Sequence, residues 1–308
     1  MKATRPADIP VLSRREFVRA SFLAASGVAL GLNAAGSDKQ ALPRPIIGFS
    51  KPFQSMGAVD MAAFVEEVGW SGIECPVRTQ GQIEPERVGE ELPRLAEAFR
   101  RRGLDIPIVV TGITSIHEAH AEEVLRVAAK LGVRKFRLGA FMYTHDRPLE
   151  QQLDGFGHDL REIGEACGEL GIQAAVQNHS GSDRFGAAVW DLVGVLKDFR
   201  VKNVGICFDI AHATIEGGLS WPIQARLAEP FRTAVYIKDF TWSKGPSGWQ
   251  PNWCPLGEGM VDRSYLSGLK RSGYSGTICQ HQEYPMGDRA DMAAHIKRDL
   301  EVLRRWLG

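Results

Sequence analysis

The chain has 308 residues, and its 37 lysine and arginine residues are balanced by 37 aspartate and glutamate residues, so the formal net charge at pH 7 is zero. That balance argues against a nucleic-acid-binding protein, which needs clustered basic residues to neutralise phosphates. Hydrophobic residues make up 44% and charged residues 24%, which is typical of a soluble globular protein, and the length suits one large domain or two small ones.

The N-terminal segment has the features of an export signal. A twin-arginine motif, Ser13-Arg14-Arg15-Glu16-Phe17-Val18, precedes an apolar run from Ala20 to Leu32. The run is too short to span a bilayer, which takes about 20 apolar residues, but it suits a secretory signal. We predict a signal and linker over residues 1–43, export to the periplasm without a stable membrane span, and a single domain over residues 44–308. The alternative is an amphipathic first helix.

From Pro45 onward, short apolar runs that predict strands alternate with amphipathic runs that predict helices. Eight strands are expected, at Ile46–Ser50, Gly72–Cys75, Asp105–Thr111, Lys135–Gly139, Gln173–Asn178, Asn203–Asp209, Ala234–Asp239 and Gly276–His281. Helices are expected at Asp60–Val68, Val88–Arg102, Ser115–Leu131, Asp154–Leu170, Ala188–Phe199, Pro222–Leu227, Tyr265–Arg271 and Asp291–Leu307. Several are followed by a glycine, such as Gly69 or Gly171, which suits the left-handed cap of a helix.

Regular alternation of strands and helices predicts parallel strands joined by crossover helices. Eight such units in a chain of this length match the (β/α)8 TIM barrel, which forms one domain of roughly 250 residues. The rival, a doubly wound open sheet, wants a glycine-rich phosphate loop after its first strand. Here that position reads Ser50-Lys51-Pro52-Phe53-Gln54 and holds no such motif. We therefore predict an α/β fold of the TIM-barrel type.

Polar residues gather where the predicted strands end, which is the catalytic end of such a barrel. They are Glu74, Arg78, Arg137, Gln177, Asn178, His179, Asp209, His212, Lys238, Asp239, His281 and Glu283. His281 and Glu283 are two residues apart, so both face the same side of a strand. Burying a carboxylate without a partner is costly, and this pair therefore favours a functional role over packing.

Structural alternatives stay open for these residues. Asp209 suits the N-cap of the following segment, and His212 suits a packed loop histidine. The neighbours Lys238 and Asp239 suit an ion pair at the strand end. Arg78 and Arg137 suit ion pairs with Glu74 or Asp209 in place of contacts with a substrate.

Six short sequence motifs of the chain, taken in combination, are typical of one known protein family. They are Gly48-Phe49-Ser50-Lys51-Pro52, Gly72-Ile73-Glu74-Cys75-Pro76-Val77-Arg78, Asn178-His179-Ser180-Gly181, Phe208-Asp209-Ile210-Ala211-His212, Ile237-Lys238-Asp239 and Pro255-Leu256-Gly257-Glu258-Gly259-Met260-Val261-Asp262. From Pro45 to its end, the chain resembles the sugar phosphate isomerase/epimerase group of xylose isomerase-like TIM barrels. The resemblance implies a divalent metal, often manganese, magnesium or cobalt, bound by Glu, Asp, His and Glu on strands five to eight. It also implies that the two Glu residues move the substrate's proton.

The chain departs from that ligand set at three places. Gln177, Tyr236 and His281 stand where the family has Glu, His and Glu, with Glu283 two residues further on, and only Asp209 is retained. A glutamine offers a metal one neutral oxygen and cannot act as a base, so the two-carboxylate mechanism does not carry over. Two hypotheses stay open: a metal site made of Asp209, Gln177, His281 and Glu283, and a metal-free site.

The remaining residues suit acid–base chemistry on a sugar or keto-sugar. Glu283 or His281 is the predicted base, His212 the predicted acid, and Lys238 the predicted stabiliser of an oxyanion. The predicted substrate-binding residues are Glu74, Arg78, Arg137, Asn178, His179, Asp239, Glu258 and Trp242. Trp242, with Trp249 and Trp253 in the same loop, suits either stacking on a sugar ring or packing of the loop onto the barrel.

We therefore predict an isomerase or epimerase that acts on a small-molecule sugar. The alternatives are a keto-sugar lyase, a carbohydrate-binding barrel without turnover, and a nuclease that resembles endonuclease IV. The neutral charge and the export signal both speak against the nuclease, and export also argues against a phosphorylated sugar.

Overall fold

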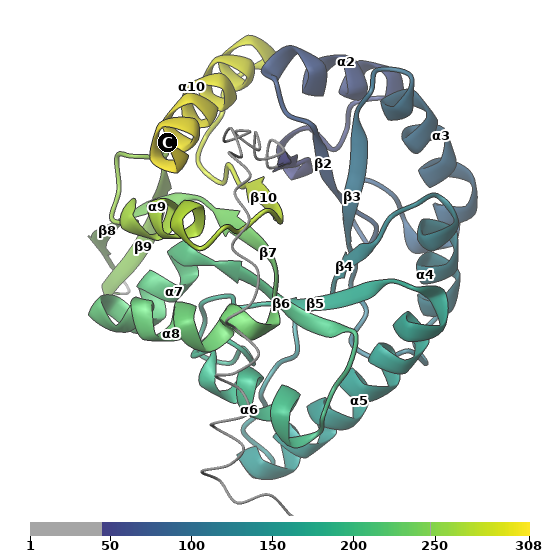
Figure 1. Cartoon of the computed structure of the whole chain (residues 1–308), viewed down its shortest axis with the longest axis vertical. Coiled ribbons are helices and arrows are strands. Elements are labelled where there is room, and N and C mark those ends of the chain that lie inside the picture. The colour runs from purple at the N-terminus through teal and green to yellow at the C-terminus, as the bar shows by residue number, and fades with distance from the viewer. Residues whose placement is uncertain (1–44, 247) are drawn as a thin grey trace, which may run out of the picture. The chain divides into compact units, whose positions relative to one another are not determined.

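The computed structural model describes residues 45–246 and 248–308. Eight parallel strands close into a barrel in the order β1-β10-β7-β6-β5-β4-β3-β2. They are β1 (Ile46–Phe49), β2 (Gly72–Pro76), β3 (Asp105–Val110), β4 (Lys135–Arg137), β5 (Gln173–Gln177), β6 (Val204–Asp209), β7 (Arg232–Ile237) and β10 (Thr277–Gln280). Helices lie around these strands in Figure 1. The predicted (β/α)8 barrel is confirmed, with all eight strands where the apolar runs placed them.

The helices are α2 (Ala58–Val68), α3 (Val88–Arg100), α4 (Ala121–Lys130), α5 (Leu149–Leu170), α6 (Trp190–Asp198), α7 (Ile210–Gly217), α8 (Trp221–Ala228), α9 (Ser264–Arg271) and α10 (Arg289–Leu307). Short 3₁₀ helices lie at Lys51–Phe53, Pro85–Arg87, Gly218–Ser220 and Glu229–Phe231. Of the nine α-helices in the described residues, α7 was not predicted, and neither was an antiparallel hairpin made of β8 (Asp239–Gly245) and β9 (Gly248–Cys254).

Glycine caps end two of the helices as predicted, and a turn delays the start of a third. Gly69 and Gly171 follow α2 and α5 with φ of +84° and +66°, a left-handed conformation that glycine adopts without strain. The helix α4 begins later than predicted, because the Glu118 carboxylate accepts hydrogen bonds from the backbone amides of Thr114 and Ser115 and holds that segment in a turn.

The hydrophobic core has two layers. Most buried apolar side chains pack between the strands and the helices, among them Phe64, Phe99 and Phe208. A smaller cluster fills the barrel itself and is made of Ile47, Phe49, Ile108, Val110, Ala175, Cys207, Ala234, Tyr236 and Cys279. Buried polar side chains lie above this cluster at the carboxyl ends of the strands, and the barrel floor is therefore a rigid base for a site.

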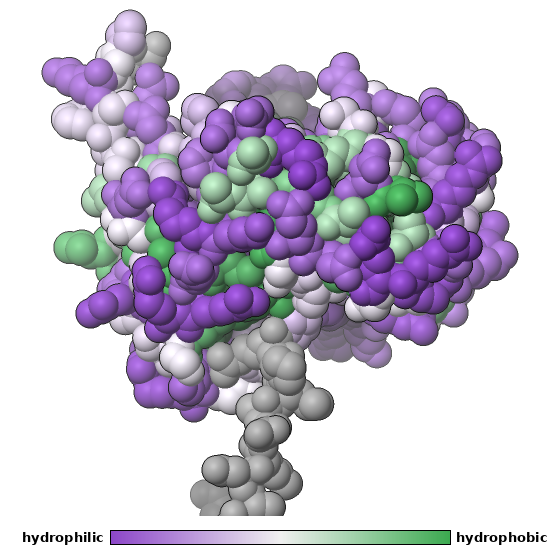
Figure 2. All heavy atoms as spheres, turned by 90° about the horizontal axis from the view of Figure 1, so that it is seen from above, coloured by the Kyte–Doolittle hydropathy of each residue, from purple (hydrophilic) through white to green (hydrophobic). Residues whose placement is uncertain are grey.

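The outer face is mainly hydrophilic where Figure 2 shows it, with hydrophobic residues in smaller patches between polar ones. This pattern follows from helices that turn their apolar side to the strands. Within the described part of the chain, none of the helices has the length and hydrophobicity to cross a membrane.

Candidate active site

A cavity of about 250 Å³ lies at the carboxyl ends of the strands. It is lined by residues at or just after the ends of β1, β2, β3, β4, β5 and β10, the chain segments that form the active end of a barrel of this type. Its apolar wall contains Phe49, Phe141 and Phe185. The polar lining is made of Lys51, Arg78, Thr111, Arg137, Gln177, His179, Arg184 and Glu283. A cavity lined by phenylalanine rings and by charged side chains suits a small organic ligand that carries polar groups.

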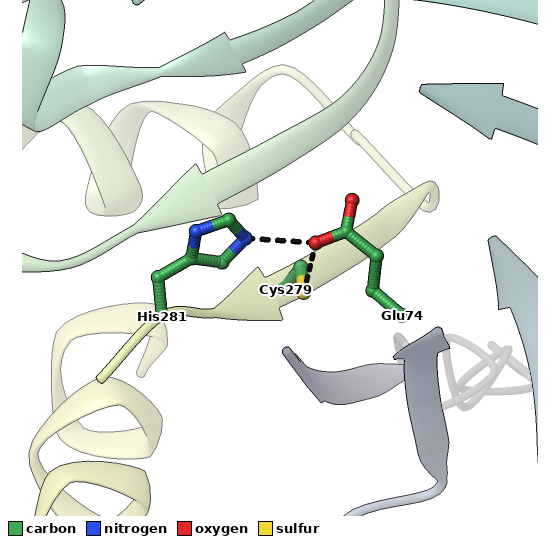
Figure 3. A group of neighbouring side chains, drawn as sticks. All are labelled: Glu74, Cys279 and His281. Atoms are coloured by element: carbon green, nitrogen blue, oxygen red, sulfur yellow. Dashed lines mark hydrogen bonds and ion pairs between the residues drawn. The ribbon is translucent and has the colours of Figure 1, made fainter. Parts of the chain in front are cut away.

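The floor of the cavity rests on the fully buried carboxylate of Glu74, shown in Figure 3 with two of its neighbours. Arg137 Nε lies 3.3 Å from Glu74 Oε1, His281 Nε2 lies 3.0 Å from Glu74 Oε2, and the Tyr236 hydroxyl donates a hydrogen bond to Oε1. Burial opposes ionisation of Glu74, but Arg137 and His281 outweigh it and hold the pKa of the carboxyl below its ordinary value. The floor is therefore an ionised pair inside the barrel.

The side chains of Glu74, Cys279 and His281 come close enough together to be tested as a metal site, with ligand atoms within 4.8 Å of one another. The guanidinium of Arg137 already pairs with the Glu74 carboxylate. Burial raises the pKa of the Cys279 thiol well above its ordinary value, so the sulfur is a protonated thiol and a poor ligand. The cluster thus offers a divalent ion only one carboxylate, that of Glu74, and Arg137 already neutralises it. These three side chains therefore do not fit a divalent metal.

A second charge network surrounds Lys238, which is buried just beyond the end of β7. Its ammonium lies 2.7 Å from Glu283 Oε1, 3.4 Å from Asp209 Oδ2 and 4.2 Å from the ring of Trp253. Burial would raise the pKa values of both carboxyls, but Lys238 outweighs it, so the pKa of Asp209 is about 2 and that of Glu283 lies well below its usual range. Both carboxyls are therefore ionised at neutral pH.

This network bears on the metal ligands that the sequence predicted. Lys238 occupies the position between Asp209 and Glu283 where a cation would bind. The side-chain oxygen of Gln177 accepts a hydrogen bond from Arg137, and its amide nitrogen donates to Asp209 Oδ2 at 2.9 Å. Asp209, Glu283 and Gln177 thus already face protein cations or N–H groups, and they do not fit a divalent metal as they stand. The fourth predicted ligand, His281, lies between the carboxylates of Glu74 and Glu283.

Asp209 and its neighbours support the site through hydrogen bonds that join β5, β6 and α7. Asp209 is the N-cap of α7 and accepts hydrogen bonds from the backbone amides of Ala211 and His212, as the structural alternative proposed. Asn178 bonds to both backbone groups of Asp209, at 2.7 and 3.0 Å, and joins β5 to β6. His212 is buried, and its ring lies 3.9 Å from that of His179. Burial places its pKa well below the ordinary value, so it is neutral.

His179 also lines the cavity. Its Nδ1 lies 2.8 Å from the Ser180 carbonyl oxygen, which only accepts, so Nδ1 carries the hydrogen and Nε2 keeps a lone pair. Burial, followed by the charges of Lys238 and Arg184, lowers the pKa of His179 to about 4. At neutral pH the ring is therefore uncharged and able to accept a proton.

The pKa of His179 predicts how stability depends on pH. An unfolded histidine titrates near 6.5, so between about pH 6.5 and 4 the unfolded chain binds more protons than the folded one, and the free energy of unfolding falls as the pH falls. In His179→Gln this fall should be smaller by roughly 2 kcal/mol. Urea unfolding at a series of pH values measures it, with the exposed His145→Gln as control. An equal fall in wild type and His179→Gln would contradict the assignment.

The predicted site residues fall into two groups in the structure. Glu283, Arg78, Arg137, His179 and Gln177 line the cavity. The other residues support it or lie elsewhere: Glu74, His281, Lys238, Asp209, His212, Asn178, Asp239, Glu258 and Trp242. Lys51 and Arg184 also line the cavity and were missed, although each follows a predicted strand, which was a usable signal.

Three of the supporting residues have contacts of their own. The Asp239 carboxylate accepts hydrogen bonds from the amides of Gly257, Gly259 and Val261, and it organises the loop after β9. Glu258 is exposed and pairs with Arg298 at 3.2 Å. Trp242 packs edge-on against Phe240.

The chain belongs to the xylose isomerase-like TIM barrel family, whose pattern it matches over residues 62–306. No curated protein matches it.

Among solved structures, it is similar to 3-keto-D-glucoside 4-epimerase from E. coli, with 16% identity, a TM-score of 0.66, and coverage of 85% of this chain and 99% of that one. It is also similar to a xylose isomerase-like TIM barrel protein from Mycobacterium smegmatis in complex with magnesium, with 17% identity, a TM-score of 0.62, and coverage of 87% and 99%. A third is the probable 3-DHS dehydratase from Bacillus anthracis, with 14% identity, a TM-score of 0.67, and coverage of 85% and 98%. At these identities the likeness shows the fold alone.

Proposed function

We propose that the chain is a sugar or keto-sugar isomerase or epimerase that works by acid–base chemistry in the cavity. Family membership and the name of the E. coli epimerase with the same fold support a sugar as substrate. The observation that carries the proposal is Glu283, the only carboxylate among the residues that line the cavity. A carboxylate in a confined site suits removal of a proton from the carbon beside a carbonyl group.

The proposed reaction begins when Glu283 takes that proton. The electrons of the broken C–H bond form a carbon–carbon double bond, and the carbonyl oxygen becomes an oxyanion beside the guanidinium of Arg137. For an isomer, the Nε2 lone pair of His179 takes the proton of the neighbouring hydroxyl group and passes it to the oxyanion, while protonated Glu283 gives its proton to the former carbonyl carbon. For an epimer, the same carbon takes a proton from solvent on its other face, and Glu283 releases its own proton to solvent.

Lys238 and His281 are positioning residues in this proposal. Lys238 contacts Glu283 and Asp209 together, so Asp209 retains the ammonium when Glu283 becomes protonated. His281 lies between the Glu74 and Glu283 carboxylates, at 3.0 and 3.6 Å. We propose that the positive charges of Lys238 and Arg137 stand in place of a divalent metal, because three of the four predicted metal ligands, Asp209, Glu283 and Gln177, already contact those two side chains.

Solvent deuterium exchange tests the proposed reaction without knowledge of the product. The protein is incubated in D2O with a panel of keto-sugars, including 3-keto-D-glucosides, D-fructose and D-tagatose, and NMR detects deuterium at the carbon beside the carbonyl. Glu283→Gln should lower the exchange rate about 10²- to 10⁴-fold, the usual contribution of a general base.

Glu301→Gln, an exposed change on α10, is the matched control and should leave the rate unchanged. Full exchange by Glu283→Gln would rule out the catalytic assignment. Binding of a sugar without exchange would favour a carbohydrate-binding barrel, and loss of water from the sugar would favour a lyase.

The place of action is also a proposal. The twin-arginine segment lies outside the described residues, and on its sequence we propose that the protein acts in the periplasm. Fractionation of cells that express the full chain, with Arg14→Lys/Arg15→Lys as the comparison, tests export directly.

A further inference from the structure

The cavity has more positive charge on its wall than the proposed proton transfer uses. Arg78, Arg184 and Lys51 come from the segments after β2, β5 and β1, and all three line the cavity. Within the described residues, none of them has an acidic side chain within ion-pair distance. The other cavity-lining arginine, Arg137, is different, because Glu74 neutralises it.

The carboxylates around the cavity do not balance these cations. Glu283 lines the cavity, but it already shares Lys238 with Asp209. Taken with the networks beneath the cavity, five cations face three carboxylates, which leaves two positive charges in excess: the cations are Lys51, Arg78, Arg137, Arg184 and Lys238, and the carboxylates are Glu74, Asp209 and Glu283. A confined site with an excess of one sign attracts ligands of the other sign.

Arg78 is not an ordinary solvated surface arginine. Its side chain is half-buried, and burial, followed by the charge of Arg137, lowers the pKa of its guanidinium. Both effects disfavour the positive charge of Arg78, and a bound anion would stabilise it. The turn that carries it is tight, since the Gly81 amide bonds to the Arg78 carbonyl at 2.8 Å and a Cβ at Gly81 would lie 2.7 Å from that oxygen. Arg78 is therefore held beside the cavity by its backbone.

Arg184 is placed in a comparable way. It follows Gly181, whose φ of +149° suits glycine, and a Cβ at Gly181 would lie 3.1 Å from Arg184 Cδ. The Arg184 amide donates to the Gly181 carbonyl at 3.4 Å, which closes the turn. Both arginines thus lie on turns that depend on a glycine, and both present a planar fork that binds carboxylate or phosphate oxygens in pairs.

We propose that the substrate is an anionic sugar, whose carboxylate or phosphate group is bound by Arg78 and Arg184 with Lys51 nearby. The inference rests on the proposed function for the idea that the bound molecule is a sugar, but the anion site stands on the charges of the cavity wall. The predicted export signal favours a carboxylate, as in a sugar acid, over a phosphate.

Calorimetric titration with matched sugars tests the proposal. The probes are D-glucose, D-glucuronate and D-glucose 6-phosphate, measured at low and at physiological salt with wild type, Arg78→Gln, Arg184→Gln and the exposed control Arg101→Gln. We expect at least one anionic probe to bind tenfold or more tightly than D-glucose and to bind more weakly as salt rises. Each cavity variant should weaken that binding tenfold or more, and the control should change it less than twofold.

Two results overturn the anion site: equal affinity for D-glucose and its anionic derivatives, including no binding of any of them, or unchanged affinity in both cavity variants. The deuterium exchange experiment fails separately. Salt-dependent binding of an anionic sugar without exchange would keep the anion site and remove the proposed reaction. Exchange on neutral keto-sugars, together with equal affinity for D-glucose and its anionic derivatives, would keep the reaction and remove the anion site.

Discussion

Replacement of Lys238 with methionine is expected to lower the free energy of unfolding by about 3–5 kcal/mol and the exchange rate by about 10²-fold or more. The ammonium of Lys238 lies 2.7 Å from Glu283 and 3.4 Å from Asp209, and without it the buried carboxylate of Asp209 and the partly buried one of Glu283 repel each other. Urea unfolding and the deuterium exchange assay measure the two effects. Lys244→Met, an exposed lysine of the β8–β9 hairpin, is the control and should change neither by much.

The same variant separates a lysine at the site from a metal at the site. In Lys238→Met, the carboxylates of Asp209 and Glu283 lose their shared partner, and Mn²⁺ should then raise the melting temperature by several degrees through mass action. Wild type should show no such rise. Stabilisation of wild type by Mn²⁺, with none in Lys238→Met, would reverse the assignment.

Replacement of Arg137 with methionine is the second large effect, again about 3–5 kcal/mol of lost stability. Glu74 is fully buried and its pKa is lowered chiefly by Arg137, against the opposing effect of burial, so removal of the arginine leaves a charge without its main partner. The double variant Glu74→Gln/Arg137→Met should be more stable than the sum of the two single changes predicts, because the uncompensated charge is gone. If urea unfolding showed that the two losses of unfolding free energy simply add in the double variant, the ion pair between Glu74 and Arg137 would be contradicted.

Much of the fold could be predicted because each barrel strand is a short apolar run between amphipathic ones. The helix α7 could not, since its eight residues directly follow β6 and offer little periodicity. The β8–β9 hairpin was also missed, because the segment that holds Trp242, Trp249 and Trp253 was interpreted as a long loop, which either stacks on a sugar or packs onto the barrel. In the structure Trp253 lies over Lys238, whereas Trp249 is mostly exposed.

The location of the site could be predicted, but its pairings could not. Lys238 and Asp239 are neighbours in sequence, and neighbours at a strand end point to opposite sides. Asp239 therefore accepts amides of the following loop, while Lys238 meets Asp209 and Glu283 from other strands. The cations Lys51 and Arg184 lie 133 residues apart in sequence and line one cavity only because the barrel closes, so closure of the barrel had to be known first.

Crystals grown with MnCl2 and measured at the manganese absorption edge test most directly whether Lys238 takes the place of the metal. We expect the Lys238 ammonium between Glu283 and Asp209, with no anomalous peak beside either carboxylate. A manganese peak coordinated by Asp209 and Glu283, with Lys238 turned away, would contradict that claim.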